Sequence, residues 1–318
     1  MTEFSIIDRY FRFSHAGQGV DIGIGDDAAV LDSPGKLVVT VDTLLPAVHF
    51  PASTEPASIG HKALAVNLSD LAAMGAQPKW FTLALSLPQP DHDWLAGFSQ
   101  GLRELADAFD VALVGGDTVR GPLAITVQAM GIASPAGVVL RRGAQVGDDI
   151  YVSGTIGDAA LGLASLQGEA LEEAAAHYCR QRLDRPTPRV AAGLALAGLA
   201  TAMIDCSDGL MADLHHLLSA SGAGGRIEFS NLPLSPAVEG WLATGGDKQR
   251  ILTGGDDYEL IFTAPPEARD TVREIAKRSV TSLTKIGVVL AEPVLTIMDE
   301  GKPLALDREG YDHFAEQQ

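Results

Sequence analysis

Residues 62–78, KALAVNLSDLAAMGAQP, constrain the fold more than any other stretch of the sequence. The three leucines of this stretch, Leu64, Leu68 and Leu71, recur at i, i+4 and i+7, which predicts a helix with one apolar face. Gly75 and Pro78 predict where this helix ends. Asp70 is the one acidic residue, and no basic residue follows the first position of the run. Because an ionised carboxylate is costly against apolar surface, the pattern predicts that a positive group from elsewhere faces Asp70.

Strand-like and helix-like runs alternate on both sides of this helix. In the first half, strands are predicted over 28–32, 36–43, 79–87, 111–118 and 123–133, and helices over 57–75 and 94–109. The turn Ser33-Pro34-Gly35 predicts that the first two strands form a hairpin. This order predicts an α+β layer, in which helices cover one face of a mixed sheet.

The turn-like segment GAQVGDD at 143–149 predicts the boundary between an N-terminal domain, 1–142, and a C-terminal domain, 143–318. The second domain is also α/β in character. Strands are predicted over 149–154, 225–230, 258–264 and 282–290, a strand followed by a loop over 201–209, and helices over 156–166, 170–182, 188–199, 209–222 and 267–279. Ser207 is the expected N-cap of the 209–222 helix.

The composition limits the possible partners. The 318 residues are 46% hydrophobic and carry a net charge of -18, which argues against binding to nucleic acid or to an anionic membrane through bulk charge. Cys179 and Cys206 lack the spacing of a metal site or a disulfide framework, so both are expected to be reduced thiols. The N-terminus lacks an apolar signal region, and the longest uncharged stretch, 190–204, is too short to span a membrane. We therefore expect a cytoplasmic protein.

An aspartate beside glycine or a hydroxyl residue ends several apolar runs. The instances are Asp26 in GIGDD, Asp42 in TVDT, Asp70 in NLSD, Asp117 in GGDT, Asp205 and Asp208 in IDCSDG, and Asp256 in GGDDYE. Each of these residues alone is more often a helix cap or a turn residue. If several converge, however, cations must separate them, and carboxylate and hydroxyl oxygens suit Mg²⁺, which usually brings phosphates. No P-loop or Gly-rich kinase loop occurs, so Arg141 and Arg142 are the candidates for a direct phosphate contact.

The motifs occur in an order that resembles the thiamine-monophosphate kinase family. The resemblance covers residues 3–314 and rests on GIGDDAAVL, TVDTL, KALAVNLSDLAAMGA, VGGDTVRGP, LRRGAQVGD, IDCSDGL, GGDDYEL and GYDHF. This family belongs to the PurM-like superfamily of ATP-binding enzymes. The resemblance implies two α/β domains, a homodimer formed through the N-terminal sheet, and a phosphotransferase that uses ATP and several Mg²⁺ ions to convert thiamine monophosphate into thiamine diphosphate.

The resemblance also implies roles for individual residues. The implied Mg²⁺ ligands are Asp26, Thr40, Val41, Asp42, Asp70, Asp117, Asp205 and Asp208. The implied ATP contacts are Gly116, Arg141 and Ser207, and the implied contacts to thiamine monophosphate are His49, Asp256 and Tyr311. The resemblance thus makes Mg²⁺ the positive group opposite Asp70.

Two positions depart from the family pattern. Val41 stands where the family commonly has Thr, so it would bind metal through its carbonyl oxygen. Asp256 stands where the motif GGEDYE has Glu, so its shorter side chain would reach thiamine directly or through water. The acceptor is already an ionised phosphate at pH 7, so the transfer needs no general base, and no such residue is evident in the sequence.

Three other readings of the acidic pattern remain open. The first is another ATP-dependent PurM-like enzyme, such as aminoimidazole ribonucleotide synthetase or selenophosphate synthetase, although GYDHF and NLSDLAAMGA disfavour it. The second is a metal-dependent phosphohydrolase, because a carboxylate cluster also activates water. The third is a non-catalytic acidic module that binds metal.

Overall fold

The computed structural model describes residues 2–13, 19–25, 28–306 and 310. The chain divides into two compact units. Unit 1 contains residues 1–71 and 76–134, and unit 2 contains residues 72–75 and 135–318. This division falls at Ser134/Pro135, whereas the sequence predicted it at 142/143.

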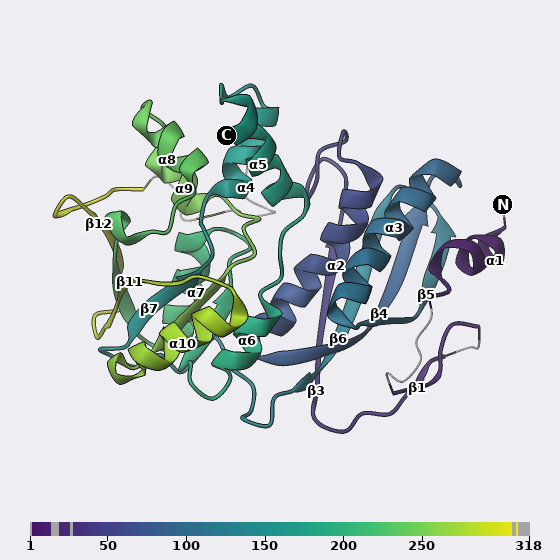
Figure 1. Ribbon diagram of the computed structural model, residues 1–318, viewed down its shortest axis with the longest axis horizontal. Coiled ribbons are helices and arrows are strands. Elements are labelled where there is room, and N and C mark those ends of the chain that lie inside the picture. Colours follow the sequence, from purple (N-terminus) through teal and green to yellow (C-terminus); the bar gives the residue numbers. More distant parts are fainter. Residues whose placement is uncertain (1, 14–18, 26–27, 307–309, 311–318) are drawn as a thin grey trace. The chain divides into compact units, whose positions relative to one another are not determined.

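Unit 1 is built on a four-stranded sheet of order β3-β6-β4-β5. Its elements are α1 (Glu3–Ile6), a π-helical turn (Ile7–Phe11), β1 (Val20–Ile22), β2 (Val30–Leu31), β3 (Leu37–Leu44), α2 (Pro56–Ala73), β4 (Ala76–Leu87), α3 (His92–Phe109), β5 (Ala112–Arg120) and β6 (Ala124–Ala133). β4 and β5 are parallel and the other pairs in this sheet are antiparallel, so the sheet is mixed. Helices α2 and α3 cover one of its faces (Figure 1).

Burial alternates along β3, and this alternation separates the two faces of the sheet. Thr40 and Asp42 are half-buried, whereas Leu37, Val39 and Val41 are 46%, 50% and 57% exposed. Side chains of a strand point alternately to opposite faces, so the exposed residues lie on the face away from the helices. This apolar surface, which we call the open face, is uncovered in the single chain.

The predicted helix carrying Asp70 is confirmed as α2, and its three leucines, Leu64, Leu68 and Leu71, are fully buried. The predicted hairpin of 28–32 with 36–43 is wrong. β2 pairs with β1, and β3 pairs along its whole length with β6, which lies some 80 residues further on. A short turn between two strands is a local signal, whereas this pairing is determined by burial of distant apolar residues.

Unit 2 has a seven-stranded sheet of order β13-β12-β9-β11-β7-β10-β8. Its strands are β7 (Asp149–Ser153), β8 (Ala202–Asp205), β9 (Gly224–Glu228), β10 (Leu260–Ala264), β11 (Leu283–Leu290), β12 (Leu295–Asp299) and β13 (Lys302–Pro303). Its helices are α4 (Asp158–Leu166), α5 (Glu173–Asp184), α6 (Val190–Leu196), α7 (Leu210–Ala220), α8 (Pro236–Ala243), α9 (Lys248–Thr253) and α10 (Arg269–Ser279). Helix α7 packs against β8, β9 and β10, and α10 packs against β11.

The predicted fold class is confirmed, because each unit combines helices with a mixed sheet. The short elements α8, α9, β12 and β13 were not predicted. Cys179 and Cys206 are buried free thiols, as expected. Ser207, however, is not the N-cap of α7, because that position belongs to Gly209, and the side chain of Asp213 accepts hydrogen bonds from the preceding backbone amides.

Candidate functional site

Unit 1 brings together three of the expected metal ligands. Thr40 and Asp42 project from β3 toward α2, where the hydroxyl of Thr40 donates a hydrogen bond to Asp70 Oδ2. Burial and the nearby charge of Asp70 raise the pKa of Asp42 from 3.8 to about 6. The carboxylates of Asp42 and Asp70 therefore repel each other across the β3–α2 junction.

His49 lies in the turn that follows β3. Its Nδ1 accepts a hydrogen bond from the backbone amide of Leu45 at 3.0 Å, and its carbonyl accepts one from the buried Lys62 at 3.0 Å. Because Nδ1 is an acceptor, a neutral His49 carries its proton on Nε2, which makes Nε2 a donor. The side chain of Val41 lies on the open face, so Val41 could bind a metal only through its backbone carbonyl oxygen.

Gly116 and Asp117 lie on β5, at the opposite edge of the sheet from β3. Asp42 pairs with Val127, and the same cross-strand row continues through Leu83 to Gly116. Neighbouring strands lie about 4.8 Å apart, so the three spacings between β3 and β5 place Gly116 about 14 Å from Asp42. Asp117 is the next residue along β5 and is exposed, so alternation turns it toward the open face. Within one chain, unit 1 does not bring Asp117 to Asp42 and Asp70.

A cavity of about 640 Å³ opens beside Gly116 and Asp117. Its lining combines the apolar side chains Ile7, Phe11 and Leu113 with the glycines Gly23, Gly25 and Gly115 and the cation Arg12. Gly116 must be glycine here, because its φ is +149° and a Cβ would lie 1.9 Å from the carbonyl oxygen of Leu83. The sequence pattern did not identify Arg12, which is paired with Asp8 at 2.8 Å.

In unit 2, two acid-bearing loops lie side by side. One follows β8 and carries Asp208, and the other precedes β10 and carries Asp256. The backbone amide of Asp256 donates a hydrogen bond to the carbonyl of Ser207, and the amide of Tyr258 donates one to the carbonyl of Cys206, each at 2.8 Å. These bonds place Asp256 beside the loop that carries Asp208, just after Asp205 at the end of β8. Asp205 is 4% exposed and the other two aspartates are half-buried.

Asp213, on the first turn of α7, organises the loop that follows β8 and was missed by sequence reasoning. Its carboxylate accepts from the amides of Asp208 at 2.9 Å and Gly209 at 3.2 Å. Burial and the charge of Asp208 raise its pKa from 3.8 to about 7, against the effect of these backbone hydrogen bonds. An acid placed four residues after a glycine at a helix start is the signal that would have found it.

The remaining expected site residues are less defined. Arg141 is exposed in unit 2, directly after Leu140, whose carbonyl accepts from the amide of Met203 at 3.0 Å. Asp26 and Tyr311 lie outside the described residues. Among the described residues, no three His, Cys, Asp or Glu side chains converge as a metal site would require.

The helices within those same residues include none that is both long and apolar enough to cross a membrane.

Two family models cover most of the chain. Residues 25–133 match the N-terminal domain of AIR synthase related protein, and residues 145–300 match its C-terminal domain. The two α/β units and the acid-bearing loops therefore define a two-domain protein of the AIR synthase related class, with PurM-like architecture.

Individual relatives narrow this class. The chain is 47% identical over 320 residues to the thiamine-monophosphate kinase of Salmonella typhimurium, and the match covers 98% of each chain. The crystal structure of thiamine-monophosphate kinase from Stenotrophomonas maltophilia K279a is 45% identical, has a TM-score of 0.87, and matches 96% of this chain and 98% of its own. This chain belongs to the thiamine-monophosphate kinase family.

A further solved structure carries ligands. The one described as "AaThiL complexed with AMPPCP and TMP" is 33% identical, has a TM-score of 0.75, and the match covers 92% of each chain.

Proposed function

We propose that this chain transfers a phosphoryl group from ATP to thiamine monophosphate and so produces thiamine diphosphate. The observation that carries the proposal is the match to thiamine-monophosphate kinases, which spans 98% of both chains at 47% identity. The complex of a 33% identical relative with AMPPCP and TMP supports a site that holds a nucleotide together with the second substrate.

Magnesium fits the oxygen donors at the β3–α2 junction. Burial and the charge of Asp70 together raise the pKa of Asp42 to about 6, and the third donor, Thr40, is a hydroxyl. Such a set of hard oxygens is typical of Mg²⁺ sites rather than zinc sites. Thr40, Asp42 and Asp70 would hold Mg²⁺ in unit 1, and Asp205 and Asp208 would hold it in unit 2. Bound Mg²⁺ supplies neutralisation of the phosphate charges of the two substrates.

The protein's own groups then bind and orient two polyanions. The phosphate of thiamine monophosphate is ionised at pH 7, so no residue has to remove a proton from it. The Nε2–H of His49 is a donor suited to this phosphate, and Asp256 and Tyr311 are assigned to the thiamine moiety. Arg141, Ser207 and the backbone of Gly116 are assigned to ATP, and the cavity beside Gly116 offers apolar surface for its base.

We further propose that the chain acts as a homodimer whose interface is the open face of unit 1. Leu37, Val39, Val41 and Val119 expose between 46% and 57% of their surfaces there. The β1–β2 segment packs against Trp80 on this face, but the apolar side chains of β3 remain exposed. Such exposed apolar surface is unfavourable in water, and a second copy of the same face is a self-complementary cover.

The division of the metal ligands also points to a second chain, at the β3 edge of unit 1. Asp42 and Asp117 lie about 14 Å apart at opposite edges and point to opposite faces, so they cannot share an ion within one sheet. A partner that brings its β5 edge to β3 would complete the site. Co-expressing Asp42→Asn chains with Asp117→Asn chains tests this idea, because each mixed dimer then contains one intact site. Recovery of about a quarter of wild-type activity is expected from random pairing, and no recovery would show that both residues act within one chain.

Acceptor choice tests the proposed reaction. With Mg²⁺ and ATP, ADP should form rapidly with thiamine monophosphate and at most slowly with free thiamine, because a hydroxyl acceptor needs a base that the site does not provide. Equal rates with the two acceptors would contradict the proposal. ADP formation independent of either acceptor would indicate a phosphohydrolase.

A further inference from the structure

The loop that carries Asp256 is held in a strained conformation. Asp256 and Tyr258 have φ values of +71° and +50°, although neither is glycine. Non-glycine residues in this left-handed region are uncommon and persist only where their surroundings hold them. The loop also runs against its neighbours, because a Cβ on Gly254 would lie 2.3 Å from Ala160 Cβ and one on Gly255 would lie 2.2 Å from Ser207 O.

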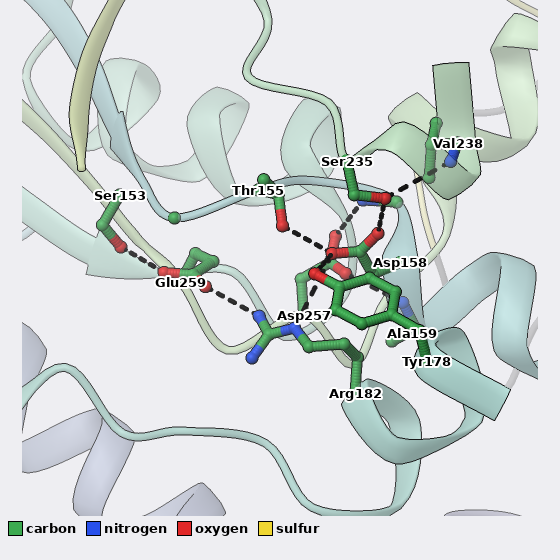
Figure 2. Close-up of polar contacts among 12 residues, drawn as sticks. Ser153, Thr155, Asp158, Ala159, Tyr178, Arg182, Ser235, Val238, Asp257 and Glu259 are labelled. Atoms are coloured by element: carbon green, nitrogen blue, oxygen red, sulfur yellow. Dashed lines mark hydrogen bonds and ion pairs between the residues drawn. The ribbon is translucent and has the colours of Figure 1, made fainter. Parts of the chain in front are cut away.

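Asp257, between the two strained residues, fastens this loop to the start of α4. Its Oδ2 accepts from the amide of Gly157 at 2.7 Å and its Oδ1 accepts from the amide of Ala159 at 3.1 Å (Figure 2). Amides at a helix start have no partner within the helix, so a carboxylate is a favourable cap for them. Asp257 is 1% exposed, whereas Asp256 is half-buried. The loop thus buries one carboxylate and leaves its neighbour accessible.

Glu259 provides a second anchor for the end of the same loop. This residue is fully buried, and its carboxylate accepts from Arg182 at 2.7 Å, from Arg189 Nε at 2.6 Å and from Ser153 at 2.5 Å. Figure 2 shows the contacts of Glu259 with Ser153 and Arg182 beside a third buried carboxylate, Asp158, which accepts from Ser235, Tyr178 and Thr155. Asp158 belongs to the same polar cluster, since Arg182 lies 3.7 Å from its carboxylate and also donates to Glu259.

We propose that Asp257 is a positioning residue, which holds the backbone on both sides of it in the left-handed conformation and so directs the Asp256 carboxylate toward the thiamine-bearing substrate. This inference rests on the proposed function, which assigns Asp256 to that substrate. Asp257 itself is too buried to touch a substrate. The expected consequence is on binding of the acceptor, because the loop meets Ser207, an assigned ATP contact, at its backbone carbonyl.

The test is a double-mutant cycle on the full-length protein, with KM measured for each substrate. Asp257→Asn leaves one acceptor oxygen and turns an NH₂ group toward an amide donor, so the cap is broken. We expect it to raise KM for thiamine monophosphate at least about fivefold and to leave KM for ATP within about twofold. In an Asp256→Ala background, Asp257→Asn should have no further effect on that KM, because it acts through the missing carboxylate.

A matched control is Asp158→Asn, which removes a buried carboxylate from the same cluster and leaves the hydrogen bonds of Asp257 to α4 in place. It should lower the melting temperature yet leave both KM values near wild type. An equal rise in acceptor KM for Asp158→Asn, or an undiminished effect of Asp257→Asn without Asp256, would overturn the proposal. If Asp256→Ala alone leaves acceptor KM unchanged, the assignment of Asp256 in the proposed function fails instead.

A second substitution at Asp257 covers the case in which Asp257→Asn does not fold. If Asp257→Asn is not recovered folded, Asp257→Ser replaces it, because serine keeps one acceptor oxygen and is a common helix cap. Failure of both variants to fold while Asp158→Asn folds would assign Asp257 to folding and would overturn the positioning role.

Discussion

The repulsion between Asp42 and Asp70 has a measurable consequence for the metal-free protein. Replacing Asp42 by Asn keeps the size of the side chain and removes its charge. In the absence of Mg²⁺ and nucleotide, Asp42→Asn should therefore unfold at a higher temperature than wild type at pH 7.5. A residue that only stabilised the fold would show the reverse.

The magnitude follows from the pKa of Asp42, which burial and Asp70 raise from 3.8 to about 6. The folded protein holds this proton up to about pH 6, whereas the unfolded chain releases it near pH 3.8, so the free energy of unfolding falls as pH rises between those values. At about 1.36 kcal/mol for each unit of pKa, the loss reaches about 3 kcal/mol above pH 7. The advantage of Asn should shrink to well under about 1 kcal/mol at pH 4.

Thermal unfolding in EDTA at pH 4 and pH 7.5 measures this difference, with Asp32→Asn as a control on an exposed carboxylate. For a chain of this size, a gain of several degrees at pH 7.5 is expected for Asp42→Asn and none for the control. Addition of Mg²⁺ and ATP should reverse the order, because ligand stabilisation scales with affinity. A destabilised Asp42→Asn at pH 7.5 would refute the repulsion and, with it, the argument for a cation at this junction.

Three further outcomes are expected. Asp70→Asn should reduce kcat at least about a hundredfold in steady-state assays, as expected when transition-state charge stabilisation is lost; near-normal turnover would mark Asp70 as a purely structural partner of Thr40. Val39→Lys, on the open face, should yield monomers by analytical ultracentrifugation, whereas Val280→Lys, at a position 91% exposed in unit 2, should not; a dimeric Val39→Lys would place the interface elsewhere. Tyr311→Ala should raise KM for thiamine monophosphate about tenfold and leave KM for ATP unchanged, as expected for loss of an aromatic contact; equal changes in both values would contradict a role at the thiamine ring.

Much of the fold could be predicted because its signals are local. The leucine spacing of α2 and the long apolar runs of β4 and β6 identify these elements directly. The pairing of β3 could not be read in this way, because its partner β6 is distant in sequence and a nearby turn offered a plausible alternative. Short elements such as α8 depend on burial against the rest of unit 2, although its N-cap Ser235 followed by a proline was a usable signal.

The residue types of the candidate site could also be predicted, but not their grouping. Acids beside glycines indicated the loops, and the structure does place Asp256 beside Asp208 and Asp42 beside Asp70. The position of Asp117 at the far edge of the sheet depends on strand order, which the sequence does not encode locally. Asp257 was not singled out from the sequence, and only the hydrogen bonds of its buried carboxylate to α4 reveal what it holds.

Direct analysis of the reaction products tests the central claim. The purified protein is mixed with ATP, Mg²⁺ and thiamine monophosphate, and the phosphorus-containing species are followed by ³¹P NMR. If the chain is a thiamine-monophosphate kinase, ADP and thiamine diphosphate appear in equal amounts, with no accumulation of orthophosphate. Orthophosphate in place of thiamine diphosphate, or ATP that remains unchanged, would contradict it.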